Sequence, residues 1–180
     1  RRCQKYLLFD MAIYLAMVML ARCGMRISEP LRLCRYHYRA DEGSVYIERT
    51  KFRKDRLIPL PKAVVADLDN YLAARNALYP GDQNPYLLAG KKDRPLKDYQ
   101  VRAVFHQAVE KIGLKKSRRT MGNMTFGSPV PHSLRHSFAI NTLNQIKARG
   151  ISAQQALPVL AAYMGRRKDQ YTAACLKIKD

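Results

Sequence analysis

Acidic residues are scarce in this chain of 180 residues. Aspartate and glutamate together number 14 against 33 lysines and arginines, which gives a formal net charge of +19 at pH 7. The positive excess is spread along the sequence instead of being confined to a tail. A folded protein this basic is expected to bind a polyanion, with an affinity that falls as salt is added. Charge alone leaves DNA-binding and RNA-binding proteins both open.

The sequence also lacks the usual patterns of metal and nucleotide sites. The four cysteines form no C-x-x-C pair, and Cys34 with His37 has no second pair to complete a zinc site. We therefore expect free thiols in a reducing cytosol and no bound metal. No P-loop or dinucleotide-binding motif occurs, so we expect no cofactor.

Long apolar runs are absent as well. The run from Met11 to Ala21 is shorter than the roughly 20 residues that cross a bilayer, so it predicts a buried helix and no membrane partner. No signal peptide is visible, and we expect a cytoplasmic, nucleoid-associated protein. The chain starts at Arg1 without methionine, which indicates a fragment or a processed product.

Hydrophobic residues make up 47% of the chain, enough for one globular domain, and no repeat or low-complexity tract interrupts it. The pattern predicts a mainly α protein with a small antiparallel β-sheet, an α+β fold. The expected helices are 6–22, a second one starting at 27–33 with Ser28 as cap, 61–78, 98–112 capped by Asp98, 133–149, 152–163 and 169–180. Strands at 44–50 and 56–60 should form a hairpin, and 115–127 should be a loop.

Three separated segments carry residues suited to phosphodiester chemistry. The motif PHSLRHSFAI places His132 and Arg135 three residues apart on one helix face, CGMRISE contains Arg26, and TKFRKDRLIPL contains Lys51. Breaking a phosphodiester requires positive charge on the non-bridging oxygens and a proton for the leaving oxygen. Each residue also has an ordinary alternative: Arg26 could pair with Glu29, and Lys51 could be a plain hairpin lysine.

Taken together, these motifs resemble the tyrosine site-specific recombinases, the phage integrase family, over the stretch from residue 21 to the C-terminus. The resemblance implies the fold of the recombinase catalytic domain over residues 1–180, without the N-terminal core-binding domain. It also implies that Arg26 and Arg135 bind the phosphate and that His132 donates a hydrogen bond or carries a proton. Lys51 would be the general acid, whereas His136 is expected to pack.

The resemblance further implies an enzyme that binds, breaks and rejoins DNA strands in site-specific recombination or integration of a mobile element such as a transposon. Its intermediate would be a covalent 3′-phospho-protein link, which keeps the phosphodiester energy and needs no cofactor. The implied partners are double-stranded DNA and other recombinase protomers in a tetrameric synapse.

The last segment departs from the family pattern. Arg166 stands where a histidine or tryptophan is expected, and Cys175 stands nine residues later, where the nucleophilic tyrosine is expected. Tyr171, one helical turn before Cys175, is the alternative nucleophile. The sequence therefore leaves three hypotheses open: a recombinase, a catalytically degenerate relative that binds DNA without cleaving it, and a generic basic RNA-binding protein.

Overall fold

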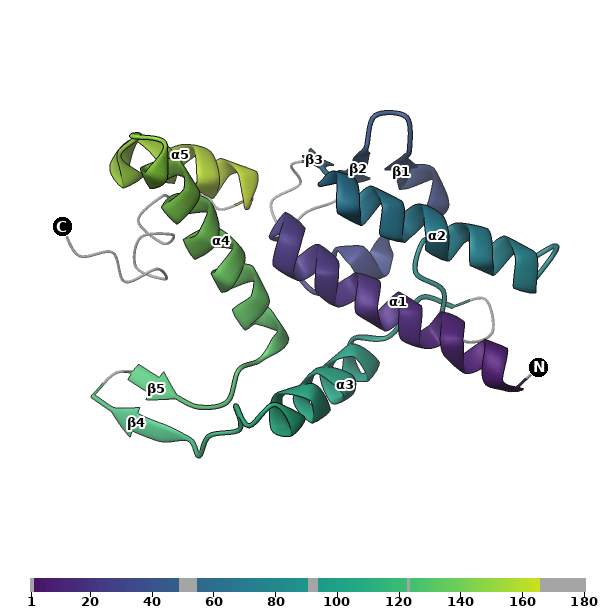
Figure 1. Ribbon diagram of the computed structural model, residues 1–180, viewed down its shortest axis with the longest axis horizontal. Coiled ribbons are helices and arrows are strands. Elements are labelled where there is room, and N and C mark those ends of the chain that lie inside the picture. Colours follow the sequence, from purple (N-terminus) through teal and green to yellow (C-terminus); the bar gives the residue numbers. More distant parts are fainter. Residues whose placement is uncertain (1, 49–54, 91–93, 123, 166–180) are drawn as a thin grey trace.

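A long apolar helix, α1 (Arg2–Cys23), is the element on which three of the other helices pack (Figure 1). The computed structural model describes residues 2–48, 55–90, 94–122 and 124–165. Helices α2 (Lys62–Leu78), α3 (Asp98–Lys111) and α4 (Pro131–Ala148) all contact α1. The segment Tyr6–Cys23 is apolar and long enough to cross a membrane by length and composition, a longer stretch than the sequence run suggested. Its core-facing side chains are buried within the protein, so we interpret α1 as a core helix.

The helix predicted at 61–78 is present as α2, and its buried face ends in an arginine. Val64, Leu68 and Tyr71 are buried, and Arg75, one turn further, is buried as well. A buried guanidinium needs partners, and Arg75 donates to the carbonyl oxygens of residues 84, 86 and 87. Arg75 thereby fixes the irregular chain between α2 and α3 against the core.

The three-stranded antiparallel sheet has the order β1 (Tyr38–Arg39), β2 (Ser44–Ile47) and β3 (Arg56–Pro59). Val45 and Ile58 are opposite each other in β2 and β3, and both are buried. The predicted strand pair is therefore confirmed. The connection at 49–54, which includes Lys51, lies outside the described residues.

The prediction of a helix starting at 27–33 is wrong. The segment forms two short 3-10 helices, η1 (Pro30–Arg32) and η2 (Arg35–His37), and the residue before η1 is Glu29, which caps it without a side-chain bond. Leu33 and Cys34, directly after η1, are both in an extended conformation, so no α-helix continues here.

Two smaller expectations need correction. The loop predicted at 115–127 contains a β-hairpin of β4 (Arg119–Met121) and β5 (Met124–Phe126), in which Thr120 pairs with Thr125. Threonine favours strands, and Gly122 takes the positive φ of +58° that a tight turn needs. Asp98 is the first residue of α3 rather than its cap, which is Lys97.

The C-terminal helices form a second apolar cluster. Helix α5 (Ala153–Tyr163) packs Leu157 and Leu160 against Ala139 and Leu143 of α4. Ser152 accepts a hydrogen bond from the Gln155 backbone, so the predicted start of this helix is confirmed. Figure 1 shows β4 and β5, which follow α3 and precede α4 in the chain, extending away from the helices.

Candidate phosphate site

Glu29 lies at the centre of a cluster of arginines drawn from separate parts of the chain. Arg26 donates from Nη1 to Glu29 Oε1 at 3.0 Å and from its backbone N–H to Oε2 at 2.6 Å. Arg56, at the start of β3, donates from Nη2 to Oε2 at 2.8 Å. Arg135 of α4 brings Nη1 within 3.9 Å of the same oxygen. Three guanidinium groups thus surround one carboxylate, and the cluster keeps an excess of positive charge.

Arg135 is held by the ends of two helices. Its Nη1 donates to the Gly24 carbonyl at 2.6 Å, just after α1, and its Nη2 donates to the Met164 carbonyl, just after α5. Carbonyl oxygens at a helix C-terminus lack intrahelical partners and carry partial negative charge. They therefore offset the burial of Arg135, whose side chain is almost entirely inaccessible.

Gly165 brings the end of the described chain onto the same cluster. Its carbonyl accepts a hydrogen bond from Arg26 Nη2 at 2.8 Å. Its φ is +64°, and a Cβ at this position would collide with Nη1 of Arg56. Glycine is therefore favoured here by its backbone conformation, and a side chain would displace the end of Arg56 from its present position. The segment that carries Arg166, Tyr171 and Cys175 begins directly after this contact.

Arg56 is the member of the cluster that the sequence did not single out. Its side chain is only 13% exposed, and its Nε and Nη1 have no hydrogen-bond partner in the described parts of the chain. Burial lowers the pKa of its guanidinium, and the Glu29 carboxylate opposes that shift. The available signal was strand alternation, because Arg56 shares its strand face with Ile58, which is fully buried.

Tyr163, at the end of α5, contacts the end of α1 and one side of α4 beside the cluster. The Tyr163 hydroxyl donates to the Cys23 carbonyl at 3.1 Å, and the Tyr163 ring stacks on Phe138 with centroids 5.7 Å apart. Burial raises the pKa of Tyr163 to about 12 and that of the Cys23 thiol to about 12, so both are neutral at physiological pH. Neither group is therefore a ready nucleophile, and both serve packing.

The structure brings together two of the sequence-predicted site residues, Arg26 and Arg135, through Glu29. The ion pair that was the ordinary alternative for Arg26 is present, and it is the same contact that builds the cluster. His132 lies one turn before Arg135 on α4, is exposed, and has its ring edge-on to His136 at 4.8 Å. The convergence of His132 with the arginines therefore stays a prediction.

The other predicted site residues are Lys51, Arg166, Tyr171 and Cys175, and all four lie outside the described residues. Their roles stay predictions for the same reason.

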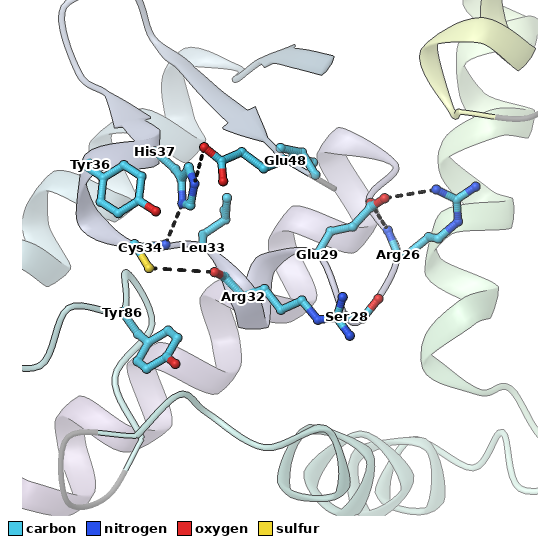
Figure 2. Close-up of a pocket in the computed structure, with 11 residues that line it drawn as sticks. Arg26, Ser28, Glu29, Arg32, Leu33, Cys34, Tyr36, His37, Glu48 and Tyr86 are labelled. Carbon is cyan, nitrogen blue, oxygen red and sulfur yellow. Dashed lines mark hydrogen bonds and ion pairs between the residues drawn. The ribbon is translucent and has the colours of Figure 1, made fainter. Parts of the chain in front are cut away.

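A hollow of about 700 Å³ lies beside the cluster. Figure 2 shows Arg26 and Glu29 at one side of it and His37 with Glu48 at another. His37 Nδ1 accepts from the Cys34 backbone N–H at 2.8 Å, and Nε2 lies 3.6 Å from Glu48 Oε1. A local hydrogen bond thus explains the Cys34–His37 spacing. The described residues contain no group of three or more potential metal ligands.

Comparison with known proteins identifies curated relatives along most of the chain. A putative integrase/recombinase, y4rE of Sinorhizobium fredii, is 29% identical over 155 residues, covering 86% of this chain and 47% of the relative. The tyrosine recombinase XerA of Thermococcus kodakarensis is 28% identical over 131 residues, covering 73% and 41% respectively. The chain therefore spans about half the length of the curated relatives it matches.

Solved structures share the fold. The XerA recombinase crystal structure superimposes with a TM-score of 0.70 at 19% identity, covering all of this chain and 60% of that one. The structure of XerH bound to its difH substrate has a TM-score of 0.68 at 20% identity. The match covers 94% of this chain and 44% of XerH. The predicted catalytic-domain fold is confirmed by this likeness. The model of the phage integrase family matches residues 5–157, and this chain belongs to that family.

Proposed function

We propose that this chain is the DNA-cleaving part of a tyrosine recombinase, which binds duplex DNA and breaks and rejoins its strands. The observation that carries the proposal is the meeting of Arg26 and Arg135 at Glu29, with positive charge in excess. The relative y4rE is named a putative integrase/recombinase, and structures of similar fold include XerH on difH and the Tn1549 transposon integrase with DNA. Integration of a mobile element is the corresponding biological role.

The two arginines have different access to a phosphate. Arg26 exposes 26% of its side chain, whereas Arg135 is buried. Arg26 therefore meets a phosphate first, and Arg135 joins when phosphate oxygens replace the carbonyls that its guanidinium now contacts. Guanidinium groups suit this task because their planar fork matches two phosphate oxygens and stays charged. Glu29 keeps the guanidinium groups oriented before DNA binds.

Two residues supply the proton transfers in this proposal. Lys51, in the connection between β2 and β3, protonates the leaving 5′-oxygen. His132 donates a hydrogen bond to the phosphate or carries a proton during the reaction. Support for both comes from their place in motifs shared with the family and, for His132, from its position one turn from Arg135.

The nucleophile belongs to the segment that follows Gly165. Cys175 occupies the expected position, Tyr171 is the alternative, and Arg166 adds a phosphate contact. A thiolate would form a phosphorus–sulfur link, and its sulfur lies nearer the backbone than a phenolic oxygen does. We therefore expect this chain to bind DNA and to cleave it poorly. Other protomers, in a tetrameric synapse on the nucleoid DNA, complete the exchange.

The second candidate function is a DNA-binding relative that does not cleave. Cys175 and Arg166 in place of the family's residues are the observations that favour it. The intact Arg26, Lys51, His132 and Arg135 favour the enzyme. One assay separates the two candidates.

The assay traps protein on a pool of nicked duplexes with a randomised core and detects covalent adducts by denaturing electrophoresis. We expect little adduct from the unmodified chain and a clear adduct from Cys175→Tyr. Arg135→Lys in that background should lower adduct formation by about 100-fold, in line with the loss of one transition-state donor. Arg135→Lys keeps the charge and most of the volume, so its DNA affinity should change only modestly.

Three outcomes would change this assignment. DNA binding without adduct from either form supports the non-cleaving relative. An adduct from the unmodified chain that Tyr171→Phe abolishes and Cys175→Ser leaves intact makes Tyr171 the nucleophile. The absence of salt-dependent duplex binding would refute both candidates.

A further inference from the structure

The hairpin of β4 and β5 is an exposed ribbon whose surface the phosphate site does not use. Residues 119–121 and 125–126 are all exposed, including Met121 at 69% and Phe126 at 42%. Ser128 closes the base of the ribbon, because its hydroxyl accepts from the Lys116 N–H at 2.9 Å and donates to the Lys116 carbonyl at 3.1 Å. A two-stranded ribbon of this length is marginal by itself in water. Its exposed faces are therefore a candidate contact surface.

The arginines of the ribbon have no acidic partner among the described residues. No aspartate or glutamate occurs between Glu110 and Asp169, whereas the ribbon and its base carry Lys115, Lys116, Arg118 and Arg119. Lys115 pairs with Glu110 at 2.6 Å. No carboxylate of the described residues forms an ion pair with Arg118 or Arg119, and both are exposed. Charge complementarity thus favours a polyanionic partner over a basic or neutral one.

The position of the ribbon fits a DNA molecule held at the arginine cluster. Five residue steps separate Phe126 from Pro131, the first residue of α4, so the two lie at most about 18 Å apart. His132 and Arg135 follow on that helix. A duplex with one phosphate at Arg26 and Arg135 would thus run within reach of the ribbon. The major groove of B-DNA is about 12 Å wide and admits a two-stranded β-ribbon.

We propose that the β4–β5 ribbon is a second DNA-binding element, which enters a groove beside the cleaved phosphate. Arg118 and Arg119 contact backbone phosphates there. The inter-strand register places Arg119 opposite Phe126 and Met121 opposite Met124, so one face carries Arg119, Met121 and Phe126. That face supplies apolar contact with base edges, such as the thymine methyl group. The inference rests on the proposed function, since it requires duplex DNA at the cluster.

The test compares two double variants of the full chain that remove the same charge. Arg118→Gln with Arg119→Gln removes the ribbon's exposed arginines. Arg39→Gln with Arg102→Gln removes two exposed arginines that are already paired, with Glu42 at 3.2 Å and with Asp98 at 3.0 Å. The measurement is affinity for a duplex of about 40 base pairs as salt rises from about 50 to 200 mM. Circular dichroism checks that both variants fold.

The salt dependence reports the number of phosphates contacted. Each lost contact reduces the slope of log affinity against log salt by about 0.9, so the ribbon variant should lose about 12-fold less affinity over this range than the unmodified chain. The control variant should keep a slope near that of the unmodified chain. This pattern supports the ribbon as a DNA-binding element.

Other results would overturn the inference. If the two variants reduced the slope equally, the net charge of the protein and not the position of the arginines would set the salt dependence. An unchanged slope for the ribbon variant, with self-association weakened by Met121→Ser and Phe126→Ser, would make the ribbon a protein interface. In either case salt-dependent binding by the unmodified chain keeps the proposed function intact, whereas its absence would refute that function first.

Discussion

Arginine plays different roles in two regions of this chain. Around Glu29, three guanidinium groups are fully or partly buried and are oriented by a carboxylate or by helix-end carbonyls. At the start of the ribbon, Arg118 and Arg119 are exposed and have no ion pair with any residue in the described chain. Buried charges need fixed partners, whereas exposed charges are solvated and are screened by salt. Under the proposed function, the first region would position a phosphate and the second would attract and hold the duplex.

Removing the carboxylate at the centre of the cluster should have the largest effect on stability. Glu29→Gln leaves Arg26 and Arg56 without their shared anion, and breaking a buried pair costs about 3–5 kcal/mol. We expect the free energy of unfolding, measured by urea denaturation, to fall by an amount in that range.

The matched control is Glu42→Gln, which breaks the exposed pair with Arg39 and should cost less than about 1 kcal/mol. Equal losses in the two variants would mean that the cluster around Glu29 contributes no more than a surface ion pair. The distinction between the two regions would then fail.

Glycine substitutions should produce a smaller difference in unfolding free energy between the two regions. Gly24 has a φ of +59°, and a Cβ there would meet the ring of Phe138. Gly24→Ala should therefore lose about 1–2 kcal/mol for the left-handed backbone and about 1–3 kcal/mol more for overpacking.

Gly122 provides the control in the ribbon. Its φ is +58°, and no described atom lies within 4 Å of the position that an alanine Cβ would occupy, so Gly122→Ala should lose only the backbone contribution. Thermal unfolding of both variants measures the difference. A larger loss from Gly122→Ala would show that the ribbon is more tightly packed than the region around Gly24.

The sequence predicted most of the fold because its long helices carry regular apolar spacing. Val64, Leu68 and Tyr71 recur at helical intervals, and α2 lies almost where this spacing places it. The 3-10 turns after Gly24 were missed because they depend on tertiary contacts. Arg35 N–H bonds to the Pro85 carbonyl, a partner that local spacing does not reveal. The β4–β5 hairpin was missed because its strands are only three residues long and β4 is exposed on both faces, so the sequence shows no alternation of buried and exposed positions.

The candidate site was predictable only in part. Motifs nominated Arg26 and Arg135, which do meet, but not the shared role of Glu29 or the presence of Arg56. Both depend on Arg56 of β3 and Arg135 of α4 reaching Glu29, which are contacts between segments distant in the sequence. The burial of Arg135 was also not evident, because the helix position of a residue does not show which carbonyls will surround it.

The most direct test of the account measures covalent adduct in the Cys175→Tyr background as protein concentration rises over the nicked duplex pool. Arg26→Lys keeps the positive charge but loses the two-pronged guanidinium contact with the phosphate. It should therefore lower the adduct plateau by about 100-fold. Arg118→Gln with Arg119→Gln should instead shift the curve to about 10-fold higher protein concentration near physiological salt. A ribbon variant that lowers the plateau as far as Arg26→Lys does, or an Arg26→Lys variant that only shifts the curve, would contradict the division between the phosphate site and the ribbon.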